Sequence, residues 1–496
     1  MRAKPGRRGR PLRASVLAWV RGVLDRGFAG GRAGSRINAR AGARPGALAA
    51  APAAALAARI TAGFIARFTA RFTARFAATS AAAFIAVFVA ALTPSLALAA
   101  TAAISGVVID ASTHAPVPGA TVTVGGVSQH TDANGAFSST LAAPIVEARA
   151  PGYLRGQATS AGGEPVTVAL TPFRPRAVYL SVYGVNNETL REGAVGLKES
   201  NGINALVIDM KGDRGLTPYP STARDAIGAT AQLTEHAPIR RDFAALVAQL
   251  HEQGFYLIAR IVVFKDDPLA SAHPELAVHD ESGHVWRDRE HLQWVDPSSH
   301  AVWAHNLDVA EEVARLGFDE VQFDYVRFPD ASGLRFAEPN TQANRTAAIV
   351  GFLQAARARL APYNVFVAAD IFGYVCWNAD DTAIGQQLEL LGGPLDYISP
   401  MLYPSGFTWG LPGCTKPTTD PGQIVRRSLA EAKARTGLPG VRFRPWLQAF
   451  RDYAFDHREF GADEVRAQTD AADSANTDGW MLWNPRNHYD PAQLPH

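Results

Sequence analysis

Segments typical of strands and helices alternate eight times between residues 177 and 490. Several of the strand-like segments are almost continuous apolar runs, as a parallel sheet buried on both faces requires. This alternation is typical of either a doubly wound sheet or a closed barrel. Eight strands, polar residues at nearly every strand end and no Gly-rich phosphate loop after the first strand favour the barrel. We therefore predict an α/β fold, a (βα)8 TIM barrel over 177–490, with strands at 177–184, 205–211, 256–264, 320–328, 365–372, 396–403, 441–450 and 479–484.

The segments between these strands carry amphipathic patterns. They predict helices at 240–254, 302–316, 341–361, 423–437 and 462–476.

Ahead of the barrel, residues 103–172 consist of short alternating segments separated by turns rich in Gly, Pro, Asn and Asp. Strands spaced about ten residues apart in this way predict a small antiparallel all-β sandwich. The segments SGVVIDASTHAPVPGATVTV and TDANGAFS, with APGY at 150–153, resemble the carboxypeptidase regulatory-like (transthyretin-like) domain. The resemblance implies a rigid accessory module, and no catalytic constellation lies in it.

Residues 1–99 follow the order of segments that is typical of a targeting leader. They hold 16 of the 48 Lys and Arg residues but only one acid, Asp25. A basic region that includes the Arg-Phe repeat at 65–76 precedes the apolar run 81–92 and the small-x-small cleavage pattern Ala97-Leu98-Ala99. The apolar run is shorter than the roughly 20 residues of a spanning helix. We therefore predict a signal peptide cleaved near Ala99 and an exported protein without stable membrane insertion; a retained anchor is the alternative.

The charge that remains after the leader points away from nucleic acid. Residues 100–496 carry 32 Lys and Arg against 45 Asp and Glu, so the body is acidic although the whole chain has a net charge of +2. An acidic body disfavours binding to a polyanion. We predict no nucleic-acid partner.

The chain has two cysteines, Cys376 and Cys414, which follow the fifth and sixth predicted strands. In an exported protein an even number of cysteines allows a disulfide. The loops after neighbouring strands lie on the same barrel face, so we predict that these two cysteines are bonded. No Cys/His cluster has the spacing of a zinc site, and we predict neither a metal nor another cofactor.

The carboxyl ends of the barrel strands form the active face of this fold, so the residues that end each strand matter most. Strand 2 ends near Asp209, strand 4 at Asp324 and strand 5 at Asp370. In strand 4 the alternation places Glu320, Gln322 and Asp324 on one side, which we expect to face the lumen. An acid at the end of an apolar strand is costly unless paired, so an ion pair closing the barrel mouth is the structural alternative for each.

Strand 4 also carries a resemblance. Its sequence GFDEVQFDYVRFP at 317–329, with WVDPS at 294–298 and YISPMLY at 397–403, is similar to a family of barrel proteins classed as glycoside hydrolases of uncharacterised function. The resemblance spans most of 177–490. It implies a barrel and glycan hydrolysis, and enzymes of the wider clan commonly carry the nucleophile at the end of strand 4, which adds weight to Asp324.

Glycoside cleavage needs two carboxyl groups, about 5 Å apart for retention of configuration. Asp324 and Asp370 end neighbouring strands, which lie about 4.8 Å apart. We predict Asp324 as the nucleophile and Asp370, flanked by apolar residues that raise its pKa, as the general acid/base. Asp209 and Asp452 are the competing candidates for the second carboxylate. The sequence lacks the chitinase-type strand with three spaced acids ending in Glu, so we do not expect substrate-assisted cleavage by that route.

Aromatic and planar polar side chains near the strand ends are candidates for contact with a sugar. Arg327 either binds the substrate or braces Asp324. The substrate-binding candidates are Arg327, Tyr325, Tyr403, Trp377, Trp446, Trp483, Gln448 and Asn484.

Two other functions fit the sequence. One is a glycan-binding barrel without turnover, and the other is a metal-dependent hydrolase with Asp209, Asp324 and Asp370 as ligands. The lack of strand-end histidines weakens the metal alternative. The leading prediction is an exported hydrolase of polysaccharide or cell-wall glycan.

Overall fold

The computed structural model describes residues 104–161, 163–229 and 239–495, so the predicted leader lies outside the described residues. Eight parallel strands close into a barrel in sequence order, each paired with its neighbours along the chain and the last with the first. The predicted parallel barrel is confirmed. Its strands are β8 (Arg176–Leu180), β9 (Ala205–Lys211), β10 (Tyr256–Val262), β12 (Glu320–Asp324), β14 (Phe366–Phe372), β15 (Tyr397–Met401), β16 (Trp446–Gln448) and β17 (Trp480–Trp483).

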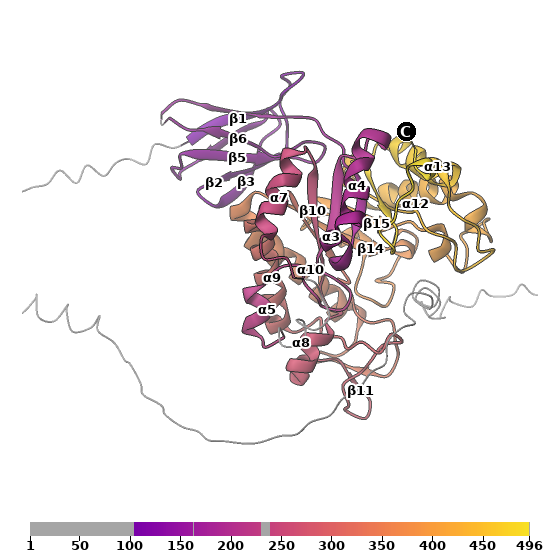
Figure 1. The fold of residues 1–496 in the computed structure, drawn as a ribbon. Coiled ribbons are helices and arrows are strands. Elements are labelled where there is room, and N and C mark those ends of the chain that lie inside the picture. Colours follow the sequence, from indigo (N-terminus) through magenta and orange to yellow (C-terminus); the bar gives the residue numbers. More distant parts are fainter. Residues whose placement is uncertain (1–103, 162, 230–238, 496) are drawn as a thin grey trace, which may run out of the picture. The chain divides into compact units, whose positions relative to one another are not determined.

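Helices surround the barrel (Figure 1). Their ends follow local chemistry: α12 begins after Asp420, whose carboxylate accepts from the backbone N–H of Gln423, and ends at Gly437 with φ of 68°. The helices are α3 (Val182–Asn186), α4 (Glu188–Asn201), α5 (Thr222–Ala226), α7 (Phe243–Glu252), α8 (Asp267–Ala272), α9 (His300–Arg315), α10 (Gln342–Leu360), α11 (Leu388–Leu391), α12 (Pro421–Thr436) and α13 (Ala462–Ser474).

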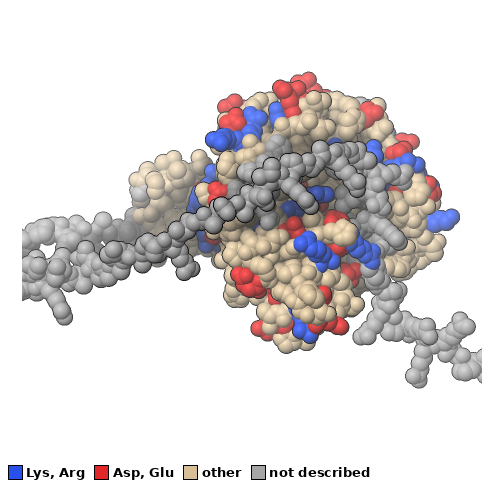
Figure 2. Space-filling model, turned by 60° about the horizontal axis from the view of Figure 1, so that its bottom comes forward, with Lys and Arg blue, Asp and Glu red and all other residues tan. Residues whose placement is uncertain are grey.

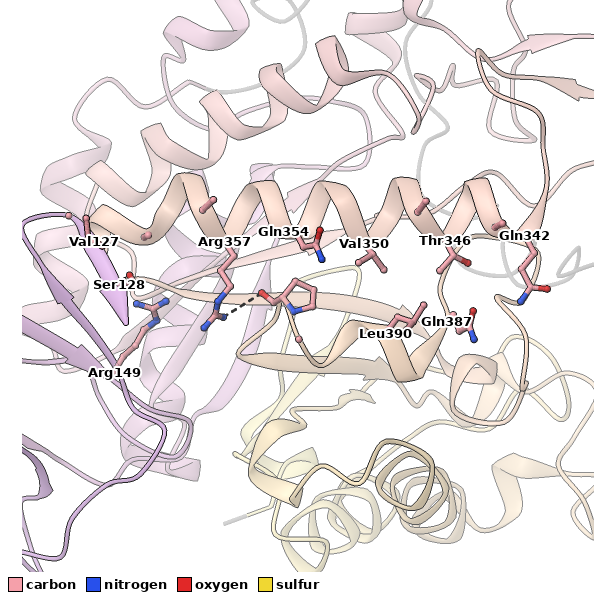
Figure 3. Close-up of a pocket in the computed structure, with 17 residues that line it drawn as sticks. Val127, Ser128, Arg149, Gln342, Thr346, Val350, Gln354, Arg357, Gln387 and Leu390 are labelled. Atoms are coloured by element: carbon pink, nitrogen blue, oxygen red, sulfur yellow. Dashed lines mark hydrogen bonds between the residues drawn. The ribbon is translucent and has the colours of Figure 1, made fainter. Parts of the chain in front are cut away.

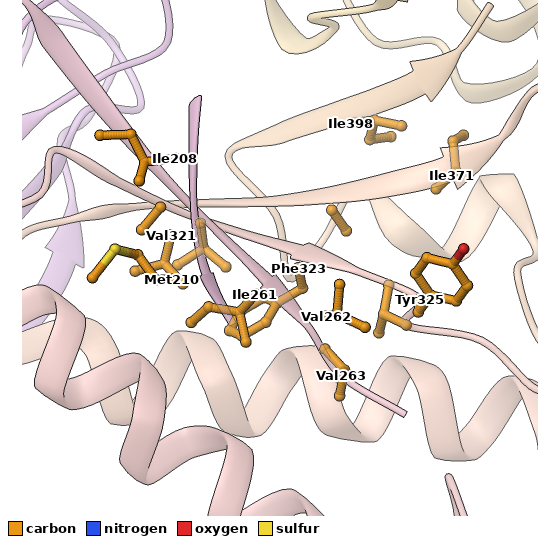
Figure 4. Packing of buried hydrophobic residues seen from close by; sticks show 14 of the residues in the cluster. Ile208, Met210, Ile261, Val262, Val263, Val321, Phe323, Tyr325, Ile371 and Ile398 are labelled. Carbon is orange, nitrogen blue, oxygen red and sulfur yellow. The ribbon is translucent and has the colours of Figure 1, made fainter. Parts of the chain in front are cut away.

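The side chains of the barrel strands belong to two separate apolar clusters. Residues such as Ile208, Ile261, Val321 and Phe323 belong to the large apolar cluster between strands and helices (Figure 4). The alternate residues of the same strands form a second cluster with many aromatic rings, which includes Tyr179, Tyr256, Tyr397 and Trp446. Because side chains alternate along a strand, this second set fills the lumen.

The polar side chains of β12 reach across the lumen. Glu320 accepts hydrogen bonds from Tyr256 of β10 and from Arg444. Gln322 donates to Ser399 of β15, and Asp324 accepts from Arg260 of β10. These contacts place Asp324 in the layer nearest the carboxyl ends of the strands.

Several strands are shorter than predicted, among them β12 and β16. β12 stops at Asp324 because Tyr325 takes a left-handed backbone conformation, with φ of 48°, which breaks the extended ladder. β16 covers only three residues, because Gly440–Arg442 forms a 3-10 turn and Pro445 has no N–H to donate.

Residues 104–170 form seven strands in two small sheets: β1 (Ile104–Asp110), β4 (Ala136–Ser139) and β7 (Val166–Leu170) in one, and β2 (Thr121–Val124), β3 (Val127–His130), β5 (Ile145–Arg149) and β6 (Gly156–Thr159) in the other. Side chains from both sheets share one apolar core. The pairing of β1 with β7 is parallel, so the expectation of a purely antiparallel arrangement is wrong at this pair. The resemblance to the carboxypeptidase regulatory-like domain stays a prediction.

This module contacts the barrel close to the amino ends of its strands. Arg149 donates to Asp396, which precedes β15, at 3.4 Å. Arg155 donates to Asp319, which precedes β12, at 2.7 Å. The contacts therefore lie at the end of the barrel opposite to the carboxyl ends of the strands.

The described part of the chain contains no helix long and apolar enough to cross a membrane.

On the face shown in Figure 2, acidic and basic side chains are interspersed.

Candidate functional site

Arg260 stands at the centre of a group of carboxylates near the carboxyl ends of the strands. Its Nη1 donates to Asp209 at 2.6 Å, and its Nη2 donates to Asp213 at 2.9 Å. Nη2 and Nε both donate to the same oxygen of Asp324, at 2.6 and 2.9 Å. Burial acts to lower the pKa of Arg260, but the carboxylates outweigh it and raise the pKa well above its usual value. The guanidinium therefore stays charged.

Asp370 lies beside this group but is much less compensated. Its Oδ2 is 3.9 Å from Nε of Arg260, is buried and has no hydrogen-bond partner, while its Oδ1 accepts from the Trp446 indole at 2.7 Å. Burial raises the pKa of Asp370 well above its usual range, and the charge of Asp324 raises it further. The surroundings of Asp370 therefore favour its protonated form, whereas Asp324 accepts hydrogen bonds from the arginine and from the backbone N–H of Tyr325.

The two predicted catalytic residues lie close together. One oxygen of each lies within 3.9 Å of the same atom, Nε of Arg260. The structure thus brings together, on neighbouring strands, a carboxyl group that is bonded to a cation and one whose surroundings favour its neutral form, the arrangement that acid/base chemistry needs.

Asp209 shares the arginine but has no free oxygen. Its Oδ1 accepts from Arg260 and its Oδ2 accepts from the Tyr179 hydroxyl at 2.6 Å. Burial raises the pKa of Asp209 to about 6, against the opposing charge of Arg260. The Asp209 side chain is 3% exposed, compared with 9% for Asp324, so Asp209 is the less accessible of the two and fits a residue that holds Arg260.

Asp452, the other alternative carboxylate, organises a loop. One oxygen accepts from the Ser405 hydroxyl at 2.7 Å and from the N–H of Ala454. The other accepts from three successive backbone N–H groups, those of residues 455–457. Burial acts to raise the pKa of Asp452, but these hydrogen bonds outweigh it and lower the pKa. Both oxygens are committed to local structure.

Two of the predicted aromatic residues lie at the carboxylate group. The half-buried Trp483 stacks on Tyr179 with ring centroids 3.9 Å apart and lies 5.0 Å from the Arg260 guanidinium. Trp446 is buried and packs edge-on against Trp483 at 5.4 Å while it donates to Asp370. Trp483 is therefore the ring that can meet a sugar, and Trp446 is a partner of the acid.

Arg327 does not brace Asp324, since that place is taken by Arg260. The Arg327 guanidinium instead lies 5.0 Å from the Trp294 ring and 5.1 Å from the Tyr325 ring, and it donates to the backbone carbonyl of Phe328. Lys265 lies 5.2 Å from the same Tyr325 ring and pairs with Glu290. Among the described residues, Arg327 has no acidic partner within 4.0 Å.

The remaining predicted contact residues differ in their surroundings. Burial raises the pKa of Tyr403 well above its usual value, and the charges of Asp370 and Asp324 raise it further, so its hydroxyl keeps its proton. Trp377 donates to Ser428 of α12 and so belongs to the helix layer. Gln448 bonds to Ser405 through both its amide atoms, and Asn484 donates to the carbonyls of residues 449 and 488, so both hold loops.

The predicted disulfide is wrong, because Cys376 and Cys414 are free thiols. Cys376 is buried in the apolar cluster between strands and helices, and Cys414 packs against the same cluster. Burial raises the pKa of Cys376 to about 12. Both side chains act as small apolar groups here.

A pocket of about 1180 Å³ lies along α10, outside the barrel lumen (Figure 3). Arg357 and Arg149 lie near one end, where Arg357 donates to the carbonyl of Pro394. Its lining contains neither a carboxylate nor an aromatic ring. The pocket therefore lacks the carboxylates that cleave a glycosidic bond and the rings that stack on a sugar, and the candidate site remains the carboxylate group.

Arg260 and Asp213 were not predicted from the sequence. A signal for Arg260 was present, since a charged residue in the middle of an apolar strand must find partners inside the barrel. The arginine also bears on the metal alternative: its guanidinium lies between the carboxylates that would have been the ligands. Within 104–161, 163–229 and 239–495, no group of three or more His, Cys, Asp or Glu side chains could hold a metal ion.

Comparisons with known proteins identify a family for the barrel region. Residues 177–489 match the model of a family described as "Putative glycosyl hydrolase domain". No curated protein matches the chain. Among solved structures, a hypothetical protein from Ruminiclostridium thermocellum is 32% identical, over 39% of this chain and 96% of that one, with a TM-score of 0.33. The PgaB glycoside hydrolase domain from Bordetella bronchiseptica is 17% identical, over 64% of this chain and 97% of that one, with a TM-score of 0.48. The PelA glycoside hydrolase domain from Pseudomonas aeruginosa is 14% identical, over 65% of this chain and 100% of that one, with a TM-score of 0.39.

Proposed function

Because the chain belongs to the family described as "Putative glycosyl hydrolase domain", we propose that its barrel cleaves a polysaccharide or cell-wall glycan with Asp324 and Asp370. One observation carries this proposal. Two carboxyl groups on neighbouring strands meet at Arg260, which bonds directly to Asp324 and leaves Asp370 buried with an oxygen free. A charged and a protonated carboxyl group side by side are the pair that glycoside hydrolysis uses.

The chemistry follows from these environments. Asp370 gives its proton to the glycosidic oxygen while Asp324 attacks the anomeric carbon, which forms a glycosyl-enzyme bond and releases the leaving sugar. Asp370, now charged, takes a proton from water as the water attacks the same carbon and frees Asp324. The product keeps the configuration of the substrate.

The burial of the acid sets a requirement. Asp370 has no exposed side-chain surface, and the Asp324 side chain is 9% exposed. The glycosidic oxygen must therefore reach past Asp324 to Oδ2 of Asp370, with a shift of the neighbouring rings. The same burial favours the second candidate function, a barrel that binds glycan without turnover.

An activity assay with matched variants tests the proposal. The full chain is incubated with xylan, cellulose, chitosan, arabinogalactan and peptidoglycan, with and without a chelator, and new reducing ends are measured. Asp324→Asn should lower the rate by several orders of magnitude, since it removes the nucleophile at constant volume. Asp370→Asn should also be severe, but milder on aryl glycosides with good leaving groups, which need less protonation.

Asp452→Asn is the control, because its carboxylate is committed to a loop. Near-normal turnover by Asp324→Asn would contradict the assignment, and binding without turnover by the wild type would support the second candidate function. Loss of activity in the presence of the chelator would support the metal-dependent mechanism instead.

We also propose that the protein is exported, on the strength of the basic, apolar and small-residue order of 1–99. N-terminal sequencing of protein secreted by the expressing cell should find a start near residue 100. A start near Met1, or retention in the membrane, contradicts cleavage.

A further inference from the structure

Among the described carboxylates that surround Arg260, Asp213 is the accessible one. Its side chain is 39% exposed, compared with 3% for Asp209, 9% for Asp324 and 0% for Asp370. A ligand that enters the barrel mouth therefore meets Asp213 before it meets the other three.

The backbone holds Asp213 in place. It lies in a tight turn in which the N–H of Gly215 donates to the carbonyl of Gly212 at 2.8 Å. Gly215 has φ of 70°, and a Cβ there would come within 2.6 Å of Asp266. Buried Arg224 donates to the Gly215 carbonyl at 2.8 Å and bonds to Asp266 through two nitrogens. The turn is thus fixed by buried ionic contacts before any ligand arrives.

One oxygen of Asp213 remains available. Oδ1 accepts from Nη2 of Arg260, and Oδ2 accepts no hydrogen bond from a described residue. Burial acts to raise the pKa of Asp213, but the charges of Arg260 and Lys265 outweigh it and lower the pKa. At neutral pH this side chain is a carboxylate with an unused acceptor.

The position of this acceptor relative to Asp324 is fixed by the arginine. The same Nη2 atom bonds to Asp213 at 2.9 Å and to Asp324 at 2.6 Å. The half-buried ring of Trp483 lies 5.0 Å from the guanidinium. A charged acceptor, a flat ring and the nucleophile therefore surround one guanidinium, within the dimensions of a single sugar ring.

We propose that Asp213 is a substrate-binding residue that accepts hydrogen bonds from free hydroxyl groups of the sugar that reacts at Asp324. The substrate class that follows is a neutral glycan whose reacting residue carries unsubstituted hydroxyls on the side that faces Asp213. The inference rests on the proposed function for the place of the reacting sugar. The hydrogen bonds from the sugar to Asp213 form when the glycan binds, so replacing Asp213 should weaken glycan binding.

Asp209 provides a matched control. It carries the same charge and bonds to the same guanidinium at 2.6 Å, but it is buried and both its oxygens have donors. Asp209→Asn alters the support of Arg260 and the hydrogen bond from Tyr179, whereas Asp213→Asn alters the support of Arg260 and removes the charged acceptor. A difference between the two variants therefore reports contact with the sugar.

The experiment is calorimetric titration of the full chain carrying Asp370→Asn, which prevents turnover and leaves the bonds of Arg260 in place. The probes are cellopentaose, xylopentaose, chitopentaose and maltopentaose. We expect at least one to bind, with an affinity that Asp213→Asn lowers about 10- to 100-fold, as for hydrogen bonds to a charged group, and that Asp209→Asn lowers less than about 3-fold. Asp213→Ala, followed by circular dichroism, repeats the test without an amide.

Several results would overturn the inference: no probe binds, Asp213→Asn and Asp209→Asn weaken binding equally, or both Asp213 variants bind normally. Failure of the proposed function has a different signature. In that case the wild type cleaves none of the glycans, yet binding still depends on Asp213.

Discussion

Replacing Arg260 by Gln tests whether one guanidinium holds the candidate site together. The change leaves Asp209 and Asp324, which are 3% and 9% exposed, without the cation that bonds to each at 2.6 Å. Removing one partner of a buried ion pair costs about 3–5 kcal/mol, because the other charge is left uncompensated. Asp213 adds little, since it is 39% exposed and water can solvate it. We therefore expect the free energy of unfolding at pH 7.5 to fall by about 3–5 kcal/mol.

The assay is urea unfolding, followed by the fluorescence of the chain's nine tryptophans. Arg327→Gln is the matched control, since this arginine has aromatic neighbours but no acidic partner among the described residues, and it should lose about 1 kcal/mol or less. The loss in Arg260→Gln should also shrink as the pH falls to 5. Without the arginine, the pKa of buried Asp209 rises further above its unfolded value of about 3.9, so the folded state binds more protons and is stabilised by acid.

Two results would refute this reasoning. One is a loss below about 1 kcal/mol at pH 7.5, which would mean that the carboxylates are solvated or paired elsewhere. The other is a loss of the expected size that does not change with pH, since relief of uncompensated carboxylates requires that they take up protons.

Two further predictions concern single side chains. Trp446→Phe removes a hydrogen bond that favours the charged form of Asp370, so the pKa of Asp370 should rise. In a plot of kcat/KM against pH, the alkaline limb should therefore move to higher pH. An unchanged limb would mean that Asp370 is not the acid. In the native protein a thiol reagent should modify half-buried Cys414 and spare Cys376 until the chain is unfolded, and a chain with no free thiols would restore the disulfide.

The strands and helices of the barrel follow from the sequence because their signals are local. The apolar run at 205–211 is a strand over the same residues, and the amphipathic segment 341–361 becomes α10 at Gln342–Leu360. The misplaced ends have a different origin. The alternating pattern of β12 continues past Tyr325 in the sequence, although Tyr325 has a left-handed backbone conformation that ends the strand. Where β12 stops is therefore determined by the packing of the whole strand end.

The candidate site was harder to predict because its acids are visible in sequence and their cation is not. Asp324 ends its strand, and Asp209 and Asp370 each lie two residues before the end of theirs, so the acids can be found one by one, but their chemistry depends on how a single guanidinium is shared. Arg260 bonds to Asp209 and Asp324 and reaches Asp370 only at 3.9 Å, so one strand-end acid is left uncompensated. That unequal sharing separates a carboxyl group bonded to a cation from one whose surroundings favour protonation. It depends on the register of β10 against β9 and β12, which puts Arg260 level with Asp209 and Gln322 and below Asp324. A shift of one residue in that register would turn the arginine out of the lumen and leave Asp324 without its cation.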